Sequence, residues 1–81
     1  MKVRVRLFAA ARTTAGGNAL DVDLPEGATV ADLRRRLGEQ VPALGGVLTL
    51  ALFAVNAEYA RDDAAIPSGA EVACIPPVSG G

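Results

Sequence analysis

The chain has 81 residues and a formal net charge of −1, from eight Lys and Arg against nine Asp and Glu. This length suffices for one small domain, and the balanced charge argues against a general attraction to nucleic acid or to membrane surfaces. The sequence has no histidine and a single cysteine, which excludes His-based catalysis, a His metal site and an internal disulfide. A folded, cytoplasmic domain without a bound metal or cofactor is therefore expected.

The first strand is predicted at residues 1–8, where apolar and basic side chains alternate. Val3, Val5 and Leu7 face the core in this prediction, and the basic side chains face outward. Phe8 falls on the outward side although it is large and apolar. An exposed apolar side chain in this position suggests contact with a partner protein.

The next segment predicts a short helix and a second strand. Residues 9–15 favour a helix that stops at two glycines. Residues 19–24 alternate again, so this strand is expected to run antiparallel beside the first.

The main helix is predicted at residues 29–40. Thr29 and Asp32 have the spacing of a capping box, in which each side chain bonds the other residue's backbone N–H. Apolar residues then recur at helical spacing. The arginines at 34–36 lie mostly off this apolar side, which predicts a solvent-exposed helix face.

Only strands and turns are predicted after the main helix. Residues 43–46 are expected to form a loop, and the apolar run 47–55 a continuous buried strand that ends near Asn56. A short edge strand is expected at 59–61. These elements, with the last strand, indicate an α+β domain with one sheet and one main helix.

The last strand is predicted at residues 71–75, and Pro76 ends it because proline has no backbone N–H to donate. If Val72 and Cys74 face the core, Ile75 faces outward. Cys74 is then interpreted as a small buried apolar residue and not as a persulfide site.

The C-terminal segment reads Pro-Pro-Val-Ser-Gly-Gly. Proline favours an extended backbone, and the five residues from Pro77 to Gly81 would reach ~15 Å when fully extended. Gly80 and Gly81 have no Cβ, so they fit a narrow channel. We therefore predict a domain at 1–75 and an extended tail at 76–81 that delivers its carboxylate into the active site of another protein.

Segments 6–16, 24–33, 54–60 and 75–81 together resemble the small subunit of molybdopterin synthase, a MoaD-type sulfur carrier of the MoaD/ThiS ubiquitin-like family. The sequence departs from the family pattern at Ala70, where an Asp is usual. The resemblance implies a ubiquitin-like β-grasp fold: a mixed sheet of four to five strands, with the last strand parallel to the first and a flexible C-terminal Gly-Gly tail.

The resemblance also implies the chemistry. The Gly81 carboxylate would be adenylated by an E1-like adenylyltransferase that uses ATP, and then converted to a thiocarboxylate. The sulfur would pass to a cyclic pyranopterin precursor in the large subunit of molybdopterin synthase, within a heterotetramer. In this interpretation the chain is a non-catalytic subunit. The implied threading residues are Pro76, Pro77, Val78, Ser79 and Gly80, and the implied interface residues are Phe8, Tyr59 and Ile75.

Other functions stay open on the residues alone. A Gly-Gly end also suits a sulfur carrier for thiamine or cysteine biosynthesis. It suits a ubiquitin-like modifier that is joined to lysines of other proteins. A simple binding module with an incidental tail is a further alternative.

Overall fold

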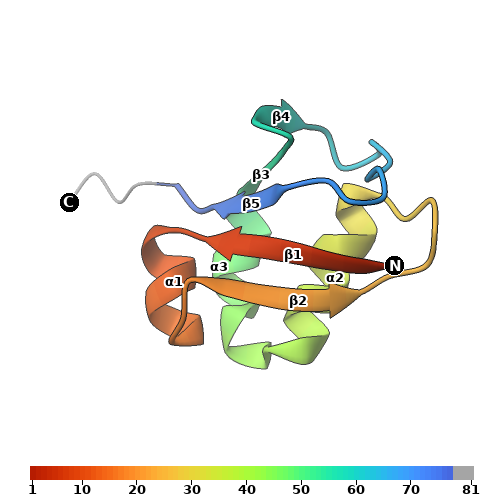
Figure 1. Ribbon diagram of the computed structural model, residues 1–81. Helices are drawn as coiled ribbons and strands as arrows, with labels where there is room; N and C mark the ends of the chain where they lie inside the picture. The colour runs from red at the N-terminus through yellow and green to blue at the C-terminus, as the bar shows by residue number, and fades with distance from the viewer. Residues whose placement is uncertain (78–81) are drawn as a thin grey trace.

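The computed structural model describes residues 1–77 of the chain (Figure 1). Its elements follow the expected order and end close to the expected residues in the first half of the chain. They are β1 (Lys2–Leu7), α1 (Ala9–Ala15), β2 (Ala19–Asp23), α2 (Val30–Gln40), the 3-10 helix η1 (Pro42–Leu44), α3 (Gly45–Leu50), β3 (Leu52–Val55), β4 (Glu58–Ala60) and β5 (Val72–Ile75).

The five strands form one mixed sheet in the order β2-β1-β5-β3-β4. The first strand β1 pairs antiparallel with β2 and parallel with β5, as expected. The last strand therefore lies at the centre of the sheet, and β2 and β4 form its edges (Figure 1). This arrangement confirms the β-grasp layout.

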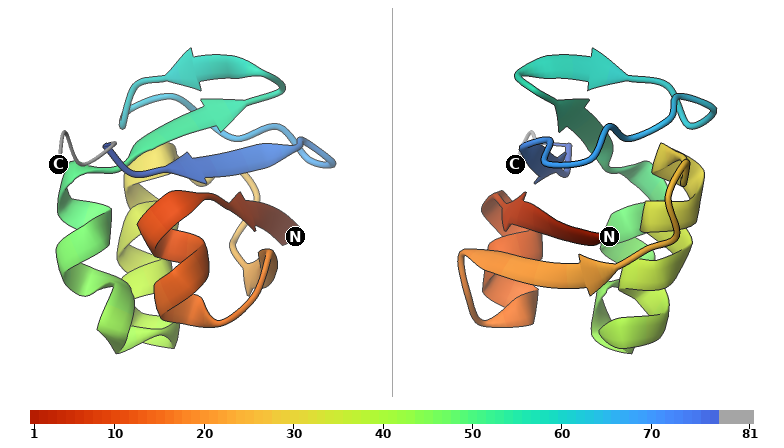
Figure 2. Two further views of the ribbon diagram at one scale, coloured as in Figure 1. Left: turned by 90° about the vertical axis from the view of Figure 1, so that its left-hand side faces the viewer. Right: turned by 45° about the vertical axis from the view of Figure 1, so that its right-hand side comes forward.

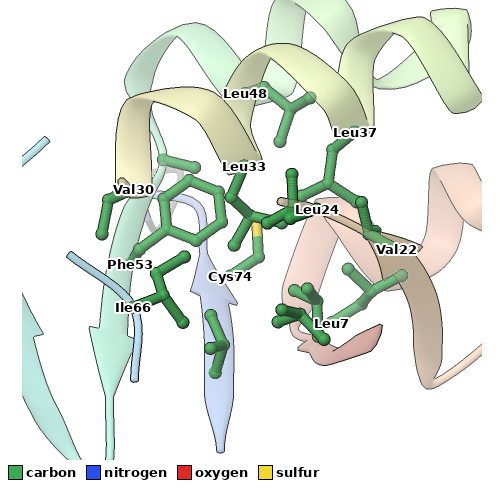
Figure 3. Close-up of a cluster of buried hydrophobic side chains, with 14 of the residues drawn as sticks. Leu7, Val22, Leu24, Val30, Leu33, Leu37, Leu48, Phe53, Ile66 and Cys74 are labelled. Carbon is green, nitrogen blue, oxygen red and sulfur yellow. The ribbon is translucent and has the colours of Figure 1, made fainter. Parts of the chain in front are cut away.

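The helices pack on one face of the sheet (Figure 2). Figure 3 shows Leu33 and Leu37 of α2 and Leu48 of α3 pointing toward Phe53 and Cys74 of the sheet. All five side chains are at most 3% exposed. Burying apolar surface in this layer is the main stabilising contribution to the fold. No helix within residues 1–77 is both long enough and apolar enough to cross a membrane.

The predicted capping box begins α2. The Thr29 hydroxyl accepts a hydrogen bond from the Asp32 N–H at 3.2 Å, and the Asp32 carboxylate accepts one from the Thr29 N–H at 2.9 Å. The backbone N–H of Thr29 holds the pKa of the Asp32 carboxyl below its ordinary value, because that bond favours the charged form. The helix therefore starts where the sequence predicted.

The predictions for residues 43–46 and 47–55 are wrong. Residues 43–46 are not a loop, because η1 covers Pro42–Leu44 and α3 begins at Gly45. The apolar run 47–55 is not one strand, because α3 continues to Leu50 and β3 starts at Leu52. A helix is favoured here since Leu44 and Leu48, four residues apart, both bury their side chains in the core.

The prediction of a solvent-exposed arginine face is wrong for Arg34. Its side chain is only 23% exposed, whereas that of Arg35 is 66% exposed. The Arg34 guanidinium donates hydrogen bonds to the carbonyl oxygens of Leu48 and Ala51, where α3 ends. It also donates to the Asp62 carboxylate at 2.8 Å. Arg34 thus satisfies carbonyls that a helix C-terminus leaves without intrahelical partners.

Candidate functional site

The sheet face opposite the helices is covered by no other element within residues 1–77 (Figure 2). Large apolar side chains are exposed there: Phe8 is 38% exposed, Leu52 56% and Tyr59 70%. A contiguous apolar surface of this kind marks interaction sites more often than single exposed side chains do. We call it the sheet-face patch, made of Phe8, Leu52, Ala54, Tyr59, Ala73 and Ile75.

Strand register brings the patch together from β3, β4 and β5, with Phe8 directly after the end of β1. Leu52 of β3 lies opposite Ile75 of β5. Phe8 follows Leu7, whose partner is Cys74, so Phe8 lies beside Ile75. These three residues form one row across the sheet, from segments more than twenty residues apart in the sequence.

A second row lies next to the first. Tyr59 of β4 is opposite Ala54, Ala54 is opposite Ala73, and Ala73 is opposite Arg6 of β1. Two small side chains therefore form the middle of this row, with an aromatic ring at one end and a guanidinium at the other. The small side chains leave a shallow hollow of about 140 Å³, lined by Arg6, Phe8, Ala54, Ala57, Glu71 and Ala73 among others.

The backbone around Phe8 is fixed on both sides. Its N–H donates to the carbonyl oxygen of Cys74 at 3.3 Å, and its own carbonyl accepts from the Ala11 N–H at 3.1 Å. The next residue, Ala9, has a φ of +50°, in a region that alanine rarely adopts. This kink ends β1 and starts α1, so the Phe8 ring is held at the end of the sheet.

The turn between β3 and β4 is similarly strained. Asn56 has a φ of +51° and Ala57 a φ of +68°, the left-handed pair of a two-residue type I′ hairpin. Asparagine tolerates this region, whereas alanine does so at a cost. Ala57 lines the hollow, so the strained residue belongs to the same surface.

Asn56 also fixes the start of β5. Its N–H donates to the carbonyl oxygen of Glu71 at 2.8 Å, and its side-chain oxygen accepts from the Glu71 N–H at 3.0 Å. The hairpin turn and the last strand are therefore tied together beside the hollow.

The tail begins at the same end of the sheet as Phe8. β5 ends at Ile75, as predicted; Pro76 is buried and Pro77 is exposed. The remaining predicted residues, Val78, Ser79, Gly80 and Gly81, lie outside the described residues. The site thus combines the exposed apolar sheet-face patch with the point where the tail leaves the sheet.

Cys74 offers no alternative reactive group. Its side chain is 0% exposed, and burial raises the pKa of its thiol to about 11. A buried, protonated thiol is a poor nucleophile. Within residues 1–77, no group of three or more His, Cys, Asp or Glu side chains has the arrangement of a metal site.

The structure brings together all three interface residues predicted from the sequence, Phe8, Tyr59 and Ile75. Their role in binding stays a prediction. Sequence reasoning missed Leu52, because it assigned residues 47–55 to one fully buried strand. The run has no period-two alternation that would set Leu52 apart. Leu52 faces outward because its strand neighbour Phe53 faces the core.

Comparison with known proteins gives the family. The pattern of the ThiS family matches residues 5–81. The molybdopterin synthase sulfur carrier subunit of Chlamydomonas reinhardtii is 42% identical over 83 residues, covering 100% of both chains.

Two solved structures share the fold. SAMP1 of Haloferax volcanii has a TM-score of 0.87 and 32% identity, with 100% of both chains covered. A putative molybdopterin converting factor, subunit 1, from Pyrococcus furiosus has a TM-score of 0.84 and 30% identity, covering 96% of this chain and 99% of that one. The chain belongs to the ThiS family, and its full-length resemblance to the small subunits of molybdopterin synthase is confirmed.

Proposed function

We propose that the chain is the sulfur-carrier subunit of molybdopterin synthase and that its C-terminal carboxylate, on Gly81, carries the sulfur. One observation carries this proposal: the sheet-face patch lies at the end of β5, where the tail begins. A partner that covers the patch would receive the tail directly. The proposal is supported by the relatives, which are named as sulfur carrier subunits of this synthase.

The chemistry starts from an unreactive group. A terminal carboxylate has a pKa of ~3.3–3.7 and is ionised at neutral pH, which makes it a poor electrophile. An E1-like adenylyltransferase would join it to AMP from ATP and release pyrophosphate. A sulfur donor at the oxidation level of sulfide would then attack the carbonyl carbon and expel AMP, which leaves a thiocarboxylate. No oxidation or reduction is needed in these two steps.

The second half of the cycle would take place in the large subunit of the synthase. The thiocarboxylate sulfur would bond to a carbon of the pyranopterin precursor and displace an oxygen substituent from that carbon. Water would then break the bond between the sulfur and the Gly81 carbonyl carbon, which leaves the sulfur on the precursor and regenerates the carboxylate. In this cycle the chain provides a delivery arm and a docking surface, and the large subunit provides the active site. We propose no metal or cofactor bound to the chain itself, and a heterotetramer of two copies of each subunit.

Mass spectrometry tests the proposal directly. Incubation with the adenylyltransferase, ATP and a sulfide donor should raise the mass of the chain by the exchange of one oxygen for one sulfur. A variant with one extra residue after Gly81 is the matched control, and it should keep its mass and its circular dichroism spectrum. An unchanged mass of the wild type, under conditions that convert a known carrier, would refute the proposal.

A second candidate function is that of a protein modifier. It is favoured by the likeness to SAMP1, which another structure names small archaeal modifier protein 1. Immunoblots of cell extract would then show conjugates of higher mass that disappear when Gly81 is deleted. Chains linked through the modifier itself would be limited to Lys2 and the N-terminus, because Lys2 is the only lysine.

A further inference from the structure

The basic residues on the outward face of β1 differ in their cross-strand partners. Lys2 lies opposite Asp23 and Arg4 opposite Asp21 on the neighbouring strand β2. The Nε of Arg4 is 3.1 Å from a carboxylate oxygen of Asp21. Arg4 is therefore paired with a carboxylate across the β1–β2 pair, and Lys2 has an acidic residue directly opposite it.

Arg6 breaks this series. Its cross-strand neighbours are Ala19 on β2 and Ala73 on β5, which carry no charge. Within residues 1–77, no carboxylate oxygen lies within 4.0 Å of an Arg6 nitrogen. Glu71 lines the same hollow but forms no such ion pair with Arg6 in this part of the chain. The Arg6 charge is thus available for a charge on another molecule.

The Arg6 guanidinium is also oriented toward the sheet-face patch. Its central carbon lies 5.6 Å from the centre of the Phe8 ring, within the range of a cation–π contact. Arg6 lines the hollow of about 140 Å³ on the patch and a second one of about 210 Å³ beside Arg4 and Gly69. Any protein that covers Phe8 therefore also covers Arg6.

Covering Arg6 has an energetic consequence. A guanidinium that loses its water costs free energy unless a charged partner replaces that water. Arginine binds a carboxylate through two parallel hydrogen bonds, which matches the flat carboxylate group. The sheet-face patch therefore favours a partner that places an acidic side chain against Arg6.

We propose that Arg6 is a specificity-determining residue of the sheet-face patch, and that it binds an Asp or Glu side chain of the large synthase subunit docked on Phe8. This proposal rests on the proposed function, because it takes the large subunit as the partner. It adds one property of the partner. The segment of the large subunit that docks on the patch has an acidic side chain next to the apolar side chain that packs against Phe8.

The affinity of the chain for the large subunit encoded in the same genome tests this proposal. Arg6→Ala should weaken binding at least about tenfold, because it leaves the partner's carboxylate buried and unpaired. Arg4→Ala is the matched control, since it removes an equally charged, exposed residue of the same strand that is already paired with Asp21. It should change the affinity less than about threefold. Arg6→Lys should fall between the two, because an ammonium group does not form the two-bond contact.

The salt dependence of binding distinguishes an ion pair with the partner from a role of Arg6 in folding. Raising the ionic strength should weaken wild-type binding more than Arg6→Ala binding, since screening acts on the pair that the variant lacks. Equal losses for Arg6→Ala and Arg4→Ala, with wild-type binding intact, would refute the role of Arg6 and leave the proposed function standing. Failure of the wild type to bind the large subunit at all would instead refute the proposed function.

Discussion

The guanidinium of Arg34 lies 4.9 Å from the centre of the Phe53 ring, between the main helix and the sheet. Phe53 is a core residue of β3, only 1% exposed. The same guanidinium donates to the carbonyls of Leu48 and Ala51, and Ala51 directly precedes Leu52 of the sheet-face patch. A single side chain of α2 thus connects the end of α3, the core and the start of the strand that carries part of the sheet-face patch.

Replacing Arg34 should therefore destabilise the fold. Arg34→Met keeps the length of the side chain but leaves the carbonyls at the end of α3 without their charged donor. Hydrogen bonds to charged groups contribute about 1.5–3 kcal/mol, and a loss of that size is expected in the free energy of unfolding in urea. Arg36→Met is the control, because Arg36 pairs with Glu39 on the exposed side of the same helix. It should lose less than about 1 kcal/mol, and equal losses would contradict the role assigned to Arg34.

Relieving the strained hairpin should stabilise the chain. Ala57→Gly removes the Cβ at a φ of +68°, where an L-residue costs roughly 1–2 kcal/mol. Glycine loses more backbone entropy on folding, so a net gain of about 0.5–1 kcal/mol is expected. Thermal unfolding followed by circular dichroism measures it.

Ala10→Gly is the matched control for this substitution. Ala10 is exposed but lies in α1 with ordinary helical geometry, so the same change should destabilise the chain. The two variants should shift the midpoint temperature in opposite directions. A shift in the same direction would show that the Ala57 backbone stores no strain.

Two exposed leucines close together in the sequence test whether the large subunit binds the sheet-face patch or any exposed apolar side chain. Leu52 is 56% exposed on the sheet-face patch, and Leu50 is 69% exposed at the end of α3. Leu52→Ala should weaken binding to the large subunit about fivefold or more, as expected for an anchoring interface residue. Leu50→Ala should leave the affinity unchanged. Calorimetric titration measures both, and a loss only for Leu50→Ala would place the interface elsewhere.

Cys74 should make the stability pH-dependent in alkaline solution. Its thiol has an ordinary pKa of 9.0 and a folded pKa of about 11. Below pH 9 the thiol is protonated in both states; between pH 9 and 11 it ionises first in the unfolded chain, which favours unfolding. The wild type should therefore lose stability through this window faster than Cys74→Ala does.

Urea unfolding at several pH values measures the difference between the two chains. At pH 8, a thiol-reactive dye should label the wild type only when urea unfolds it, because the folded side chain is 0% exposed. Rapid labelling of the folded chain would contradict the assignment of Cys74 to the core.

Local patterns in the sequence predict β1, the outward position of Phe8 and the start of α2. The alternation around Val5 predicts β1 and the outward position of Phe8, and both follow from side chains pointing to opposite faces of a strand. The Thr29–Asp32 spacing predicts the start of α2, because the hydrogen bonds of a capping box form within four residues. The composition also excluded histidine chemistry without any knowledge of the fold.

Features that depend on contacts between distant segments could not be predicted from local patterns. The apolar run 47–55 has no period, so its division into α3 and β3 depends on how Leu48 packs against α2 and the sheet. The sequence gives no sign that Arg34 differs from the neighbouring arginines, because the carbonyls that it binds belong to the end of α3, at Leu48 and Ala51. The row of Phe8, Ile75 and Leu52 exists only through strand register, since register is set by pairing between distant segments that no local pattern encodes.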